Sequence, residues 1–394
     1  MTKLLIKLFV KDYKETDNGV VRGRYGLLSS VVGIIINLLL ATFKIIVGAL
    51  FSMVSITASG FDNLTDCGSN IVSLISFRVS AKPADREHPF GHARIEYIAS
   101  MIVAMLICVL GIELIISSAQ KIFEPVAMVF QIIMIVSLGV SILFKIWLFF
   151  FYRKISKTID SEVLRAAATD SLSDCLTNAA VIVSILISHF SGFNLDGYIG
   201  LAVAVVVIIA GIKIFKTTMN ELLGEAPTKE TIRKIKDIIF SHTGVFGVHD
   251  MIVHNYGPSR TYASVHVEVD ADKSILESHD LIDVIEREIS NKLKINAVIH
   301  MDPIVIDDPE VNTMRETTRE LVRSVDNSYS VHDFRMVKGI THTNLIFDVA
   351  IPFESKAKEE NVMSQIDAKI KEISEDYFTV ITVERQVGLE EKDN

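Results

Sequence analysis

Six apolar runs, each of about bilayer length, fill the first half of this 394-residue chain. A helix that crosses the hydrocarbon core of a membrane needs roughly 20 mainly apolar residues. The runs that meet this length are approximately 27–49, 53–77, 96–119, 127–151, 163–189 and 198–215. They predict an all-α bundle of six transmembrane helices, residues 24–218, which lies in a lipid bilayer.

The Lys and Arg residues indicate the direction in which each helix crosses. They precede the first run, lie between the second and third and between the fourth and fifth, and follow the sixth, whereas the opposite connections "GALFSM" and "SGFNLDG" contain none. Cytoplasmic connections carry this excess of basic residues. We therefore expect both termini in the cytoplasm. Residues 1–23 read as a cytoplasmic amphipathic segment, and the absence of targeting signals fits the plasma (inner) membrane of a prokaryote.

Two of the runs carry pairs of aspartates at helical spacing. Asp62 and Asp66 lie four residues apart in "DNLTD", and Asp170 and Asp174 repeat the spacing in "TDSLSD". Residues four apart share one helix face, about 6 Å apart along the axis. One such residue could equally be a helix cap or a satisfied buried group, but four buried acids cost on the order of 10 kcal/mol without compensation. Partial protonation or a divalent cation between the helices would remove this cost; Lys145 is one candidate partner, which could equally snorkel.

Beyond about Phe215 the sequence has the pattern of a soluble domain of mixed charge. Amphipathic helical segments alternate with strand-like segments in the order helix, strand, strand, helix, strand over residues 228–306. This order predicts an α+β ferredoxin-like cytoplasmic domain, residues 219–308, with a small sheet under two helices.

The end of the chain repeats that pattern. The segment "SVHDFRMVKGITHTNLIFDVAIP" echoes "GVHDMIVHNYGPSRTYASVHVEVD" at an offset of about 82 residues. The offset keeps a histidine at His332, the counterpart of His249, and pairs His266 with Asp348, His279 with Asn361, His300 with Thr382 and Asp302 with Glu384. It predicts a second ferredoxin-like module, residues 309–394, which keeps the fold, lacks most ligands and serves in dimer contact or stiffening.

These motifs together resemble the cation diffusion facilitators, a family of six-helix divalent-metal efflux transporters. The resemblance is carried by "DNLTD", by the loop "AKPADREHPFGHARIEY" and by "AAATDSLSD", at matching spacing. It implies a homodimer that exchanges metal for protons, with the transported ion bound by Asp62, Asp66, Asp170 and Asp174.

The resemblance also implies two further metal sites. Asp85, His88 and His92 form a D-x2-H-x3-H string, which by itself reads more readily as a polar loop that caps the next helix. The family has a peripheral site there, concerned with coupling or regulation. A binuclear site in the cytoplasmic domain would use ligands that singly read as surface residues: His249, His266, His279, His300 and Asp302.

The identity of the transported ion is predicted from the acid at Asp170, where zinc exporters of the family usually have histidine. A set of carboxylates suits harder ions such as Mn²⁺. We therefore expect Mn²⁺ as the main substrate, with Zn²⁺, Fe²⁺ and Co²⁺ as rivals, although Zn²⁺ could bind more tightly in vitro.

Other functional classes find little support. The sequence has no phosphate-cradling loop, kinase glycine motif or nucleophile elbow, so we expect neither an enzyme nor an organic cofactor. A net charge of −9 without a basic, aromatic-rich cluster argues against nucleic acid. A membrane-anchored metal sensor or scaffold without transport remains the alternative from another class, and a passive cation channel is a third.

Overall fold

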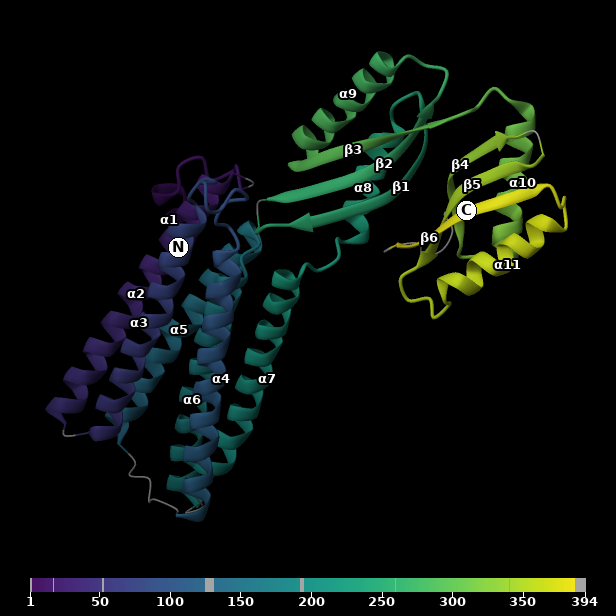
Figure 1. Ribbon diagram of the computed structural model, residues 1–394. Helices are drawn as coiled ribbons and strands as arrows, with labels where there is room; N and C mark the ends of the chain where they lie inside the picture. The colour runs from purple at the N-terminus through teal and green to yellow at the C-terminus, as the bar shows by residue number, and fades with distance from the viewer. Residues whose placement is uncertain are drawn as a thin grey trace. The chain divides into compact units, whose positions relative to one another are not determined.

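The computed structural model describes residues 2–16, 18–51, 53–124, 131–191, 195–258, 260–339 and 341–386 (Figure 1). Several residues that the predictions cover lie outside this description. They are Met1 and Asp17 of segment 1–23, Ser52, the start of run 127–151, residues 192–194, Ser259, Ile340 and the last eight residues of module 309–394. The chain forms two compact units: Met1–Glu225 with Asn255–Arg260, and Ala226–His254 with Thr261–Asn394.

The first unit is a bundle of long helices, each of which coincides with one predicted run. After the short α1 (Thr2–Phe9) come α2 (Gly19–Leu50), α3 (Val54–Ser80), α4 (Ile95–Phe123), α5 (Ile132–Ile159), α6 (Glu162–Ser191) and α7 (Asp196–Leu223). Among the described residues, five of these helices are long and apolar enough to cross a membrane: α2, α4, α5, α6 and α7. Helix α3 has the length but falls below that criterion, because acids, amides and hydroxyls interrupt its apolar residues.

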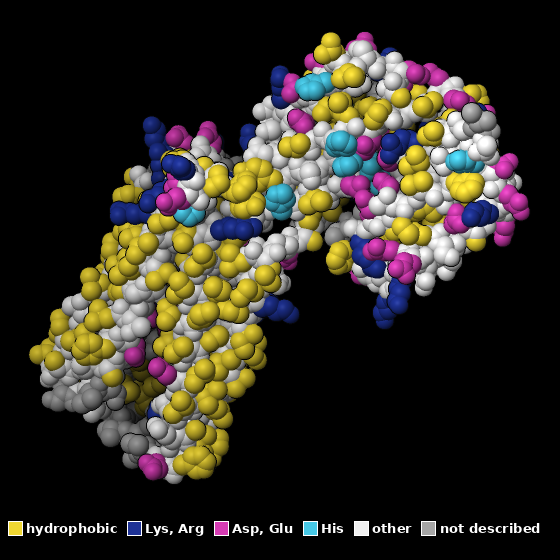
Figure 2. All heavy atoms as spheres, in the orientation of Figure 1, with side chains coloured by type: hydrophobic (Ala, Val, Ile, Leu, Met, Phe, Trp, Pro, Cys, Tyr) yellow, Lys and Arg dark blue, Asp and Glu magenta, His cyan; other side chains and the backbone are white. Residues whose placement is uncertain are grey.

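The outer surface of this bundle is covered with apolar side chains, as Figure 2 shows. Leu38, Leu143 and Ile209 are each at least half exposed, whereas the bundle interior contains buried acids, amides and two lysines. A protein in water arranges these residue types in the opposite way. The distribution is the one expected of a multi-pass membrane protein whose polar residues face the interior.

The second unit contains two small sheets covered by helices (Figure 1). Its first part runs α8 (Lys229–Phe240), β1 (Val245–Asn255), β2 (Thr261–Asp270), α9 (Ile275–Leu293) and β3 (Ile295–Ile304). Its second part runs α10 (Pro309–Val325), β4 (Ser330–Lys338), β5 (Thr343–Pro352), α11 (Glu359–Lys371) and β6 (Tyr377–Gln386). The predicted order of helices and strands is thus present, and it is present twice.

The two parts match in strand order and in register. The sheets have the orders β1-β2-β3 and β4-β5-β6. Thr261 pairs with Ile295 across the parallel β2–β3 ladder, and Thr343 pairs with Tyr377 across β5–β6, so one offset of 82 residues relates both ladders. Each part also has its own apolar core, one around Val267 and one around the equivalent Val349. We call residues 229–304 the first module and residues 309–386 the second module.

A local irregularity recurs at equivalent positions of β1 and β4. Asp250 and Asp333, each the third residue of a Val-His-Asp triplet, have left-handed φ angles of 46° and 49°. Aspartate is one of the few residues with a side chain that occurs there with any frequency. The β4–β5 register also shifts just after His332. Such bulges re-aim side chains, here next to His249 and His332.

Candidate metal sites

Three of the four predicted intramembrane aspartates converge in the bundle. Asp66 of α3 and Asp170 and Asp174 of α6 each offer a carboxylate oxygen, and these oxygens lie within 4.8 Å of one another. Asp66 and Asp170 are buried. Asp62 lies one turn before Asp66 on α3, is exposed, and is not part of this group.

Lys145 of α5 lies among these carboxylates. Its side chain is only 1% exposed, and its Nζ donates hydrogen bonds to Asp66 Oδ2 at 2.6 Å and to Asp174 Oδ2 at 2.5 Å. The sequence left two possibilities for Lys145, a buried partner of the aspartates or a side chain that snorkels to the membrane surface. The structure shows the buried partner. Three carboxylates and one ammonium leave a formal charge of −2 on the cluster, which a single divalent cation would neutralise.

Hydrogen bonds and close packing hold α2 and α3 next to this cluster. Asn70 Nδ2 donates to the backbone oxygen of Asp66 at 2.8 Å, and Tyr152 Oη donates to Asn70 Oδ1 at 2.7 Å. A Cβ at Gly33 of α2 would lie 1.8 Å from Tyr152 Oη, so glycine is required for this approach. Lys44, also buried, donates to Ser59 Oγ and Asn63 Oδ1 at 2.9 Å each.

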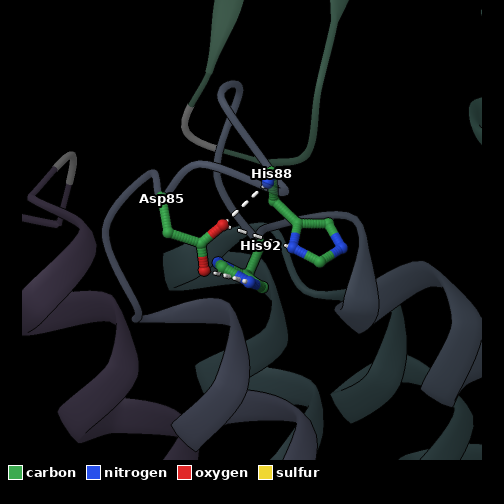
Figure 3. Close-up of side chains that lie close together, drawn as sticks. All are labelled: Asp85, His88 and His92. Carbon is green, nitrogen blue, oxygen red and sulfur yellow. Dashed lines mark hydrogen bonds and ion pairs between the residues drawn. The ribbon is translucent and has the colours of Figure 1, made fainter.

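The loop between α3 and α4 brings Asp85, His88 and His92 together (Figure 3). His88 Nδ1 lies 3.4 Å from Asp85 Oδ1, and His92 Nε2 lies 3.4 Å from Asp85 Oδ2. The backbone N–H groups of His88 and Glu87 donate to Asp85 Oδ1, and these hydrogen bonds lower the pKa of that carboxyl, that from His88 most strongly. Gly91, with a left-handed φ of 80°, allows the turn that returns His92 to the acid.

The loop is packed against residues 255–260, which belong to the same compact unit. Arg94 Nη2 donates to the backbone oxygen of Asn255 at 2.8 Å, and the rings of Phe90 and Tyr256 stack with centroids 4.3 Å apart. Phe90 lies between His88 and His92, and Arg94 follows His92, so these contacts fix the course of the loop around the candidate ligands.

Three of the four predicted cytoplasmic histidines gather around the fifth predicted ligand, Asp302 of β3. Its carboxylate lies 2.9 Å from His266 Nδ1, 3.2 Å from His249 Nε2 and 3.4 Å from His300 Nε2. Ligand atoms of one metal ion are about 3.0–3.5 Å apart when each bond is about 2.1 Å, so this spacing suits a shared ion. His279 lies exposed on α9 and belongs to none of the candidate metal groups found among the described residues.

Protons and metal would compete for this cluster. Burial alone would lower the pKa of His249, but the carboxylates of Asp250 and Asp302 beside it raise the pKa to about 9. The pKa of Asp302 is lowered, although burial acts in the opposite direction, because the imidazoles of His249 and His266 lie beside its carboxylate. A metal ion requires the neutral imidazole, so acid should weaken metal binding here.

The cluster around Asp302 lines a cavity, which also contains acids and an arginine that the sequence prediction did not include in the site. The cavity has a volume of about 350 Å³, and Figure 2 shows histidine and acidic side chains gathered on this face of the second unit. The lining residues beyond those predicted include Asp250 from the first module and Asp333, Arg335, Asp348 and Glu384 from the second. The 82-residue offset was the signal available in the sequence, since it places Asp348 and Glu384 at the positions of His266 and Asp302.

Comparisons with known proteins agree with this arrangement. Residues 30–223 match the cation efflux transmembrane domain, and residues 227–304 match the cytoplasmic domain of cation efflux proteins. The manganese efflux system protein MneS of Bacillus subtilis is 29% identical over 284 residues, which are 72% of this chain and 96% of that protein. The cation-efflux pump FieF of Escherichia coli is 27% identical over 266 residues, 67% of this chain and 88% of that protein.

An uncharacterised transporter of Methanocaldococcus jannaschii is 29% identical over 277 residues, 70% of this chain and 96% of that protein. The second module lies beyond the matched cytoplasmic domain, which ends at residue 304. The two matched domains span the bundle and the first module in the order found here, and the relatives are matched over most of their lengths. The chain therefore belongs to the cation diffusion facilitator family of cation efflux transporters.

Proposed function

We propose that the chain exports a divalent transition-metal cation, mainly Mn²⁺, from the cell in exchange for protons. The observation that carries this proposal is the convergence of Asp66, Asp170 and Asp174 around Lys145 inside the bundle. A buried cluster with a formal charge of −2 is unstable unless a cation or protons neutralise it. Alternation between the two would allow an ion to be bound on one side and released on the other.

The choice of Mn²⁺ follows from the donor atoms. Carboxylate oxygens are hard ligands, and no imidazole is found in the intramembrane group among the described residues. The name of the Bacillus subtilis relative points to the same ion. We assign Asp62 to the same transport site, because one helical turn separates it from Asp66 on α3. Zn²⁺, Fe²⁺ or Co²⁺ export is the alternative within the family.

Lys145 has a defined part in this proposal. Its ammonium occupies the position that a metal ion would take between Asp66 and Asp174, so the ion must displace it. When the ion leaves, the ammonium returns, donates hydrogen bonds to Asp66 and Asp174, and offsets one negative charge of the cluster. A tethered competitor of this kind keeps the ion from being bound too tightly to be released.

The remaining sites and the assembly complete the proposal. The Asp85–His88–His92 loop binds a peripheral ion, and the cytoplasmic cluster binds regulatory metal that draws two copies of the chain together. We place the six helices across the plasma membrane with both termini in the cytoplasm, and we assign both cytoplasmic modules a ferredoxin-like fold, the second as a duplicate of the first.

The test is transport by the purified protein in proteoliposomes over a panel of Mn²⁺, Zn²⁺, Fe²⁺ and Co²⁺, with internal pH recorded. We expect saturable Mn²⁺ flux coupled to proton movement in the opposite direction. Robust Zn²⁺ flux without Mn²⁺ flux would end the manganese assignment, and metal flux without any pH change would end the antiport assignment. A sensor or scaffold would show neither flux.

A further inference from the structure

We propose that the cavity of the second unit binds a divalent transition-metal cation between the two modules of one chain. The ligands would be His249 and Asp250 of the first module with His332 and Glu384 of the second. This site goes beyond the transport function, and it gives the second module a role in metal binding.

The geometry brings ligand atoms from both modules into one small volume. His249, Asp250 and His332 each offer a ligand atom within 4.8 Å of the others. The rings of His249 and His332 stack with centroids 4.0 Å apart. His332 Nε2 lies 3.9 Å from Asp250 Oδ1, which is too far for a hydrogen bond but close enough for both atoms to reach one ion.

The two histidines are buried with nitrogen atoms that have no hydrogen-bond partner among the described residues. His332 is 6% exposed, and both of its ring nitrogens are buried and unpartnered; His249 is 7% exposed, and its Nε2 makes no hydrogen bond of normal geometry. Buried side-chain nitrogens are paired in the large majority of cases. A ligand that accepts lone pairs from both rings would account for the exception.

The charge of the cavity points to a cation. Its lining includes five acids, three histidines and one arginine, Arg335, whose Nη2 lies 2.9 Å from Asp333. The other acids of the lining are Asp250, Asp302, Asp348 and Glu384, and the histidines contact Asp250 and Asp302. Imidazole nitrogen and carboxylate oxygen together suit Mn²⁺, Fe²⁺, Co²⁺ and Zn²⁺.

The symmetry of the repeat supports a site with two halves. His332, Asp348 and Glu384 stand at the positions of His249, His266 and Asp302. Five of these six residues line the cavity, and the sixth, His332, stacks on the ring of His249. The second module therefore carries a more carboxylate-rich half-site opposite the histidine-rich half of the first. One ion shared between the halves would fasten the modules to each other.

Direct metal binding to the full-length protein in detergent tests the proposal. Asp66→Asn and Asp174→Asn are introduced together, so that the intramembrane site does not contribute and a failure of the transport proposal does not affect the outcome. Mn²⁺ and Co²⁺ are then titrated by equilibrium dialysis, and the visible absorption of Co²⁺ reports imidazole ligation. His332→Ala removes the buried ring, and Glu384→Gln removes only a charge at a half-exposed position. His342→Ala, an exposed histidine of the same module, is the matched control.

We expect the His332→Ala and Glu384→Gln proteins each to bind one ion fewer, or to bind it at least about tenfold more weakly, than the His342→Ala control. The Co²⁺ absorption should fall in parallel for His332→Ala. Equal binding by all three proteins, or no binding by the parent protein, would overturn the proposal. If His266→Ala loses metal binding while Glu384→Gln binds as the control does, the proposal is also overturned, since the ion would then belong to the first module alone.

Discussion

The intramembrane cluster and the cytoplasmic cavity are both acidic, but they balance that charge in different ways. In the bundle a lysine lies between two carboxylates, and the donor atoms around it are oxygens. In the cavity histidines contact the central acid Asp302, and the described lining contains one arginine and no lysine. An ammonium on a flexible stem can be displaced and can return, whereas an imidazole stays as a ligand. The first arrangement favours release of an ion and the second favours its retention.

The largest effect on transport is expected when a buried carboxylate of the bundle is removed. Asp66→Ala or Asp174→Ala should reduce metal flux in proteoliposomes by about 100-fold or more, because each removes both a ligand and the partner of Lys145. Asp160→Asn, which changes a 91% exposed acid just after the end of α5, should leave flux unchanged. Normal flux in either alanine variant would contradict the transport site.

The contribution of Asp62 can be separated from that of Asp66. Asp62→Ala should reduce flux by about tenfold, less than Asp66→Ala, because Asp62 is exposed and lies outside the group of converging carboxylates. Initial rates at several Mn²⁺ concentrations would check this order. Equal losses in the two variants would show that all four acids act together on the ion.

The role of the tethered ammonium is tested by Lys145→Met. The variant should bind Mn²⁺ about tenfold more tightly and turn over more slowly, because the cluster loses its internal competitor. Binding and initial rates of transport are measured on the same preparation, with Lys145→Arg as the variant that keeps the charge. Weaker binding in Lys145→Met would show that the lysine orders the carboxylates and does not compete for them.

Substitutions in the cytoplasmic cavity should have smaller effects on transport. His266→Ala should weaken metal binding to the cavity by about tenfold, yet change the maximal flux by no more than about twofold, because the cavity retains the ion and does not pass it on. Removal of free metal with a chelator should abolish any difference in dimer formation between this variant and the parent protein. A large loss of maximal flux would place the cavity on the transport path.

The smallest effects concern the two cores of the second unit. Val267→Ala and Val349→Ala remove equivalent buried side chains, so each should lower the free energy of unfolding by about 1–3 kcal/mol. Chemical denaturation followed by circular dichroism measures both, with the exposed Val298→Ala as the control. Similar values would support two modules of one fold, whereas a negligible effect of Val349→Ala would indicate a second module that contributes little to stability.

The sequence predicted local features well and relations between distant residues less well. The long helices and the order of helices and strands follow from apolar periodicity, which is a property of neighbouring residues. The grouping of Asp66 with Asp170 and Asp174 was expected from helix-face spacing, but the position of Lys145 between them depends on how α5 packs against α3 and α6. The α5 sequence alone left a snorkelling lysine equally open.

The cytoplasmic site shows the same division. Asp302 and its three histidines were identified through a family resemblance, and the structure brings them together. His332, Asp348 and Glu384 were recognised as counterparts of ligands, but the changes from His266 to Asp348 and from Asp302 to Glu384 were interpreted as loss of ligands. That reading considered each module separately. Only the packing of the modules shows that the acids of one line the cavity of the other.

Both sides of this cavity are formed by one polypeptide chain, and this affects which substitutions the cavity can acquire. In a symmetric pair of identical subunits every substitution appears on both walls at once. Here the residue at 266 can stay histidine while the residue at 348 is aspartate, and the residue at 302 can stay aspartate while that at 384 is glutamate. Because two modules of one chain form the walls, each wall can differ in its choice of donor atoms.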